Sequence, residues 1–239
     1  MVPGGRYAEH LNIEEDMPPK IKEVFEPLRY EIAWLHAKWS IYGQLFCRGE
    51  EQLDILNSMA RAFFLIVQDS LQNDLIVGLC RITDSPHTGK RKNLTLASLA
   101  EILKDLKEAQ EREREKEESQ TDENPQSTSK EEELWREFVS QLELLAHVCA
   151  PLREWRNRRL AHSDFPTAVG QHPDPLPELV WDAIDEALAR VRVVMNIVEG
   201  HFWDSEFRYD IFTNLDDGEE VVRCLKEAQQ REKEERGEE

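Results

Sequence analysis

The side chains best suited to chemistry lie in one short segment that is rich in arginine. Residues 153–162, REWRNRRLAH, contain one acid, Glu154, and five groups able to act on phosphate esters: Arg153, Arg156, Arg158, Arg159 and His162. Arginine keeps its charge and offers a planar set of donors that fits phosphate oxygens. Histidine takes up and releases protons near neutral pH. Such a set suffices for RNA cleavage without a metal: the histidine moves the proton of the 2′-hydroxyl or leaving group, while arginine stabilises charge on the phosphorus.

The spacing leaves open which arginine works with His162. Arg156 lies six residues before His162, about 120° away around an ideal helix. Arg158, four residues before His162, shares its face more naturally. Arg156 reaches the histidine only if the helix ends or bends between them, or if its long side chain curls round. A structural interpretation also stays open, because cations interact favourably with the C-terminal end of a helix.

The overall charge argues against general binding of nucleic acids. The chain has 30 Lys and Arg against 49 Asp and Glu, a net charge of −19, and two stretches, 105–133 and 216–239, carry −12 of it. A field of this sign repels phosphate at long range, so RNA could be held only by a local basic cluster. We interpret the arginine-rich segment as the only dense basic patch.

Other signatures of chemistry are missing from the sequence. The four cysteines are dispersed, which favours buried thiols, and the seven histidines form no metal-ligand pattern. There is no phosphate-binding glycine loop and no nucleophile elbow. We therefore expect no metal and no cofactor. Because no apolar run reaches about eighteen residues and the N-terminus shows no secretory pattern, we also expect a cytoplasmic protein without a membrane segment.

Helical periodicity predicts the elements that must position these residues. Apolar residues recur at three- and four-residue steps in five stretches: 18–46, 53–82, 94–106, 134–155 and 180–202. Five helices around one core make an all-α bundle. We divide the chain into a flexible leader (1–17), a helical domain (18–215) with a disordered acidic insert (107–133), and an acidic C-terminal helix or tail (216–239). The first half of the insert can extend the preceding helix through its alternating charges.

The arginine-rich segment also resembles a known signature. RNRRLAH (156–162) resembles the R-x(4–6)-H motif of the HEPN superfamily, including the polar residue, Asn157, that often follows the arginine. Four stretches together resemble the abortive-infection U-type (AbiU-like) branch of that superfamily: EVFEPLRYEIAWLHAKWSIYGQLF (23–46), LCRITD (79–84), RKNLTLASL (91–99) and RNRRLAHSD (156–164). The resemblance extends from about residue 18 to 215, without the acidic insert.

The resemblance implies an all-α HEPN bundle that forms a homodimer, with two motifs beside one cleft. Many HEPN proteins are metal-independent endoribonucleases that leave a 2′,3′-cyclic phosphate and act as toxins or phage-defence effectors. Carried over by position, Arg156 and His162 are the catalytic pair and Asn157 orients them. We assign the remaining arginines of the segment, Arg153, Arg158 and Arg159, to substrate binding.

Three functions follow as hypotheses. The first is an endoribonuclease in phage defence or a toxin–antitoxin pair, with RNA as substrate and an antitoxin or regulatory protein as a further partner. The second is a non-catalytic HEPN module that binds RNA, a nucleotide or a protein. The third is a structural helical dimer whose acidic segments mimic nucleic acid or dock a basic partner.

Overall fold

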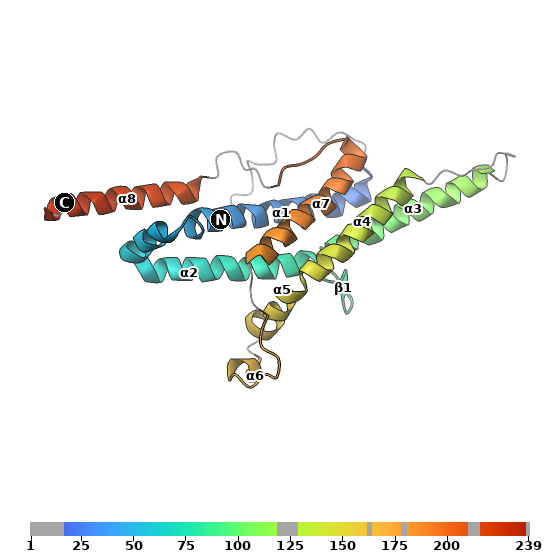
Figure 1. The fold of residues 1–239 in the computed structure, drawn as a ribbon. Helices are drawn as coiled ribbons and strands as arrows, with labels where there is room; N and C mark the ends of the chain where they lie inside the picture. Colours follow the sequence, from blue (N-terminus) through green and yellow to red (C-terminus); the bar gives the residue numbers. More distant parts are fainter. Residues whose placement is uncertain (1–16, 119–128, 162–163, 178–180, 210–215, 238–239) are drawn as a thin grey trace.

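The structure, a computed structural model, is almost entirely helical over the residues it describes, which are 17–118, 129–161, 164–177, 181–209 and 216–237 (Figure 1). Within these ranges it contains eight α-helices, one π-helical turn and one two-stranded hairpin. The elements are α1 (Pro19–Phe46), α2 (Glu50–Ile82), β1 (His87–Thr88), β2 (Arg91–Lys92), α3 (Leu96–Glu118), α4 (Lys130–Val148), α5 (Ala150–Trp155), the π-turn (Arg156–Leu160), α6 (Phe165–Ala168), α7 (Trp181–Trp203) and α8 (Asp217–Arg236). The predicted all-α bundle is confirmed.

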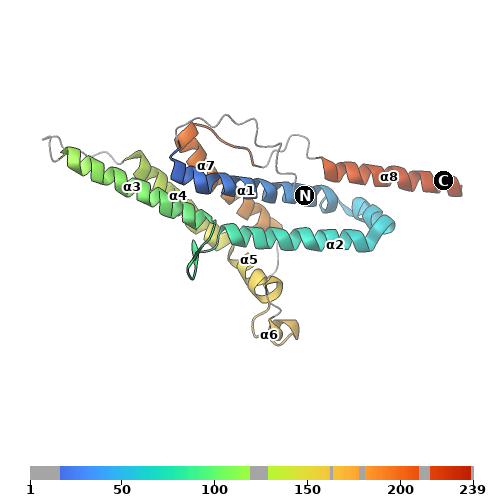
Figure 2. The same cartoon turned by 180° about the vertical axis from the view of Figure 1, so that it is seen from behind.

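The centre of the molecule is the antiparallel pair α1 and α2, crossed by α7 (Figures 1 and 2). Gly49 joins the pair at φ +103°, a conformation that glycine adopts without a steric penalty. The main core gathers the apolar faces that the periodicity predicted; its largest buried side chains include Phe25, Leu28, Ile32, Leu75, Leu79 and Phe138. Full burial of each such side chain stabilises the fold by about 1.5–3 kcal/mol.

Helices α3 and α4 form an antiparallel hairpin that extends beyond the other helices (Figures 1 and 2). α3 continues to Glu118, supported by ion pairs one turn apart such as Lys104–Glu108 at 3.6 Å and Lys107–Glu111 at 3.5 Å. α4 already begins at Lys130, where Ser129 caps it. The disordered insert predicted over 107–133 therefore needs correction at both ends, while residues 119–128 lie outside the described ranges.

The helix predicted over 134–155 is interrupted. α4 ends at Val148, and α5 starts at Ala150 with Pro151 in its first turn. Proline has no N–H to donate to the preceding turn, so a helix restarts more easily at such a residue than it continues through it. The break allows α5 and the π-turn to leave the direction of α4, and Figure 1 shows α5 and α6 projecting beneath α2.

A second core fastens α8 to the turn between α1 and α2. It contains Tyr42, Leu45, Phe46, Leu56, Phe64 and Val222. The backbone N–H of Gly218 donates to Gln44 Oε1 at 3.0 Å, and Arg48 pairs with Glu219 at 2.8 Å. The acidic C-terminal segment, predicted as a helix or tail, forms a helix through Arg236 whose first turns are packed against this core.

By length and composition alone, α2 is long and apolar enough to cross a membrane. Its most apolar 18-residue window has a mean hydropathy of 1.2, and 33% of that window is buried inside the molecule. Polar residues such as Gln68, Asp69 and Asp74 interrupt the apolar stretches of α2, so it contains no uninterrupted apolar run of eighteen residues. A single helix of this kind is weak evidence of membrane insertion, so the absence of a membrane segment stays a prediction.

Candidate active site

The arginine-rich segment adopts a π-helical turn rather than a continuation of α5. Residues Arg156–Leu160 form this turn, and the N–H of Ala161 donates to the carbonyl of Arg156 at 2.7 Å, five residues back. π-turns are rare and occur often at functional sites. The regular helix therefore ends at Trp155, immediately before Arg156.

Two side chains hold the guanidinium of Arg156. Its Nη1 lies 2.5 Å from Oδ2 of Asp84, at the end of α2, and its Nε donates to Oδ1 of the adjacent Asn157 at 3.1 Å. The Arg156 side chain is 21% exposed and that of Asp84 35%. Arg156 is thus fixed from two directions while part of its surface stays open to solvent.

Arg153 joins the ends of two helices. Its Nη1 donates to the carbonyl of Ala146 in α4 at 3.0 Å, and its Nη2 to the carbonyl of Thr83, just after α2, at 2.8 Å. Carbonyls near helix C-termini lack partners within the helix, so an arginine that bonds two of them locks the helices together. Its Nε also lies 3.9 Å from Oδ1 of Asp84. Arg153, predicted to bind substrate, therefore has its donors directed into the protein.

Arg158 organises the segment after the π-turn. It donates to Glu154 Oε1 at 2.7 Å, Thr167 Oγ1 at 3.1 Å and the carbonyl of Asp174 at 2.9 Å, and its side chain is only 12% exposed. Thr167 in turn bonds Asp164 through its hydroxyl and its N–H, which lowers the pKa of that carboxyl group. Arg158 thereby anchors α6 to the π-turn.

Arg159 differs from the other three arginines because it is exposed and lies over the ring of Trp155, with its Cζ 5.7 Å from the ring centroid. The indole N–H of Trp155 donates to the carbonyl of Pro177 at 2.7 Å, which fixes the ring. Of the three arginines predicted to bind substrate, the structure leaves Arg159 most accessible to a ligand.

His162 lies outside the described residues. On either side of it the backbone bonds back to the π-turn: Ala161 to the carbonyl of Arg156, and Asp164 to the carbonyl of Arg158 at 3.1 Å. The structure therefore brings together Arg156 and Asn157, while the pairing of either with His162 stays a prediction.

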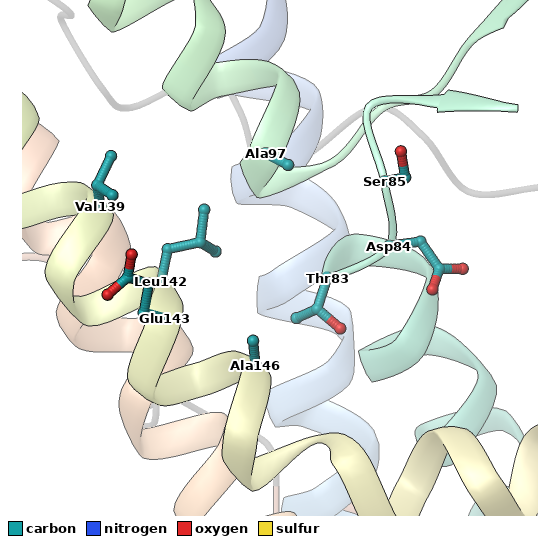
Figure 3. A pocket seen from close by; sticks show the side chains of 8 residues that line it. All are labelled: Thr83, Asp84, Ser85, Ala97, Val139, Leu142, Glu143 and Ala146. Carbon is teal, nitrogen blue, oxygen red and sulfur yellow. The ribbon is translucent and has the colours of Figure 1, made fainter.

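A pocket of about 250 Å³ lies between the end of α2, the start of α3 and α4 (Figure 3). Its lining is mainly apolar and contains two acids but no cation: Thr83, Asp84, Ser85, Ala97, Val139, Leu142, Glu143 and Ala146. In Figure 3 the side chain of Asp84 points away from Leu142 and Glu143. This lining does not suit a phosphate, and the phosphate-binding groups lie instead on the π-turn.

Two buried cysteines lie close to the arginines. Burial raises the pKa of Cys80 to about 12, although the positive charge of Arg156 acts in the opposite direction, and burial also raises the pKa of Cys149. Burial thus favours the protonated form of both thiols, which is a weaker nucleophile than the thiolate. The other two cysteines, Cys47 and Cys224, are exposed, so the expectation of buried thiols holds for half of them.

The residue that sequence reasoning missed is Asp84. It lies in LCRITD (79–84), a stretch that had supported only the resemblance. The sequence position of Asp84 could have marked it as a candidate, because it is an acid just after a long apolar helix. Nothing in the sequence connects it to an arginine 72 residues later.

Comparison with known proteins finds a family model that matches most of the chain. The family model HEPN_AbiU2, described as AbiU2, matches residues 18–221. No match was found among the curated proteins or among the solved structures. The matched range contains α1 through α7, the π-turn with Arg156 and Asn157, and the position of His162. The chain therefore belongs to the AbiU2 family of HEPN domains, which is related to abortive infection.

Proposed function

We propose that this protein is a metal-independent endoribonuclease of the HEPN type, acting in phage defence by abortive infection or in a toxin–antitoxin pair. Membership of the AbiU2 family supports the setting. The observation that carries the proposal is the fixed guanidinium of Arg156, held by Asp84 and Asn157 on a π-turn.

The π-turn supports the choice of Arg156 over Arg158 as the catalytic arginine. Arg156 can reach His162 if the helix ends between them, and the π-turn, which follows α5, ends at Leu160. Arg158 is engaged with Glu154, Thr167 and Asp174. Its guanidinium is therefore less available to a phosphate than that of Arg156, which has two side-chain partners and a partly open surface.

The proposed reaction is an internal transesterification. His162 removes the proton of the 2′-hydroxyl, and the 2′-oxygen attacks the adjacent phosphorus. The bond from phosphorus to the 5′-oxygen breaks, and a second histidine gives that oxygen a proton. The products are a 2′,3′-cyclic phosphate and a 5′-hydroxyl end. Arg156 stabilises the negative charge that grows on the non-bridging oxygens, at a position fixed before RNA binds.

The chemistry supports a homodimer, because one histidine cannot easily act as base and acid in the same step. A twofold axis would bring two copies of the motif together and supply both histidines. We expect this dimer in the cytoplasm, restrained by an antitoxin or another regulatory protein.

The test uses purified full-length protein with an end-labelled RNA pool in EDTA, beside the variants His162→Ala and Arg156→Ala. We expect cleavage by the wild type alone, with cyclic phosphate ends. Circular dichroism of the variants serves as the control for folding. Cleavage retained by His162→Ala would refute the proposal.

One observation favours a second candidate, a non-catalytic module that binds RNA or a nucleotide. The carboxylate of Asp84 already pairs with Arg156, so a phosphate must compete with this ion pair. This candidate predicts RNA or nucleotide affinity that falls on Arg156→Ala, with no cleavage by the wild type. No affinity for either ligand would end it.

A further inference from the structure

A small β-hairpin follows Asp84 directly in the chain. β1 and β2 pair antiparallel, with His87 opposite Lys92 and Thr88 opposite Arg91. Gly89 turns the chain at φ +60°, a left-handed conformation that glycine adopts readily. Figures 1 and 2 both show the hairpin projecting from the same side of the molecule as α5.

The hairpin is ordered by side-chain hydrogen bonds as well as by its short ladder. The amide nitrogen of Asn93 donates to the carbonyl of Ser85 at 2.9 Å and to Thr88 Oγ1 at 2.8 Å. The backbone N–H of Asn93 donates to the carbonyl of Pro86 at 2.8 Å. Thr95 then caps α3 by accepting from the N–H of Ser98 at 3.1 Å. The hairpin is therefore fastened between the end of α2 and the start of α3.

Three consecutive cations, Lys90, Arg91 and Lys92, lie at the tip and second strand of this hairpin, and all three are exposed. Residues 85–93 contain no acid. In the part of the chain that the structure describes, no ion pair joins these three side chains, whereas cations on α3 and α8 pair with acids one turn away. The interpretation of residues 153–162 as the only dense basic patch was thus wrong.

Asp84 limits the distance between the hairpin and the π-turn. Its carboxylate binds Arg156, and His87 follows it by three residues, which span at most about 11 Å of extended chain. Lys92 lies opposite His87, roughly 5 Å away across the ladder. Arg91 and Lys90 add at most about 7 Å, so the backbone of all three cations lies within about 25 Å of Asp84, a distance that a few nucleotides of RNA can span.

A purely structural explanation of these cations is weaker. Lysines on sheet edges often prevent strands of different molecules from pairing. Here each strand has only two residues, so there is little edge to protect. A ligand with several negative charges explains three neighbouring cations, unpaired in the described structure, better than protection of a sheet edge does.

We propose that Lys90, Arg91 and Lys92 form a second binding site, an arm that holds the phosphate backbone of single-stranded RNA next to Arg156. The inference rests on the proposed function for its choice of RNA. It also answers how a chain of net charge −19 retains RNA: the arm supplies contacts at short range, where the repulsion of distant acids is screened by salt.

The test measures affinity apart from cleavage, using full-length His162→Ala protein and a labelled single-stranded RNA at several salt concentrations. The test variant carries Lys90→Gln, Arg91→Gln and Lys92→Gln. The matched control carries Arg61→Gln, Arg231→Gln and Lys233→Gln, which remove the same charge from exposed positions on α2 and α8. Thermal unfolding of both variants confirms that the fold is intact.

We expect the hairpin variant to bind RNA at least tenfold more weakly near 0.1 M salt, and the control to change less than twofold. The slope of log affinity against log salt should decrease by about 2 in the hairpin variant, since each phosphate contact contributes about 0.7. Equal losses in both variants, no loss in the hairpin variant, or no RNA binding by the parent protein would each overturn the inference. RNA binding through the arm without cleavage by the wild type would refute the proposed catalysis and leave the arm standing.

Discussion

Arg156 and Asp84 are 72 residues apart in the chain, yet Nη1 of the arginine lies 2.5 Å from Oδ2 of the aspartate. The contact joins the end of α2 to the π-turn that carries the proposed catalytic arginine. Asp84 thus connects two basic elements, because it binds Arg156 and immediately precedes the hairpin that contains Lys90–Lys92.

The substitution Asp84→Asn should slow RNA cleavage by roughly 10–100-fold. The amide of asparagine keeps the shape of the side chain but removes its negative charge. A hydrogen bond to a charged group contributes about 1.5–3 kcal/mol, and here that bond positions Arg156. Single-turnover cleavage rates measure the effect. Glu31→Gln is the control, because it breaks the Arg81–Glu31 ion pair between α2 and α1, which does not contact Arg156. Faster cleavage by Asp84→Asn would show that Asp84 restrains Arg156 instead of positioning it.

The substitution Asn157→Ala should reduce the rate of RNA cleavage by roughly 2–10-fold without changing thermal stability. The exposed amide oxygen accepts one hydrogen bond from Nε of Arg156, and a single such bond contributes about 0.5–1.5 kcal/mol. Cleavage rates and melting temperatures, measured on the same preparation, separate the two effects. A variant with wild-type rates would leave Asn157 without a role in orienting the arginine.

Arg158→Ala and Arg159→Ala should have opposite consequences. Arg158 makes three hydrogen bonds that hold the segment from Glu154 to Asp174, so its loss should lower the free energy of unfolding by about 1–3 kcal/mol. Arg159 is exposed and stacks on Trp155 alone in the described residues, so its loss should change stability little and weaken RNA binding. Urea unfolding and RNA titration distinguish them. Similar stability losses in both variants would contradict this assignment.

Because Glu199 is buried, we expect the stability of the protein to depend on pH. Its side chain is 2% exposed and lies 3.1 Å from Nε of Arg29 and 3.2 Å from the hydroxyl of Tyr209. Burial raises the pKa of Glu199, although Arg29 and Tyr209 act in the opposite direction. The folded state therefore holds this proton more tightly than the unfolded state, and the associated stability is lost as pH rises through the raised pKa.

Glu199→Gln removes that titration. The stability of the wild type relative to Glu199→Gln should fall as pH increases above about 4.5, the ordinary pKa of glutamate. Chemical unfolding of both proteins between pH 4 and pH 8 gives the difference directly. A difference that stays constant, or that grows in favour of the wild type with pH, would show that the ion pair with Arg29 outweighs burial.

The helices were predictable because their information is local. Apolar residues at three- and four-residue steps define one face of each helix, and burial of that face is the main gain on folding. The same reasoning selected residues 156–162, since the types and spacing of Arg156 and His162 can be read without knowing the fold. The sequence alone thus determined the all-α class, the matched family and the candidate motif.

The tertiary structure decided which groups these side chains contact. Arg153, Arg156 and Arg158 have the same chemistry in sequence, but the first bonds the ends of two helices, the second Asp84, and the third the segment around α6. Those partners lie up to 72 residues away. Helical periodicity does not encode them, because such pairs depend on how helices pack. For the same reason, only the fold brings Asp84, which precedes the hairpin of Lys90–Lys92, to the π-turn.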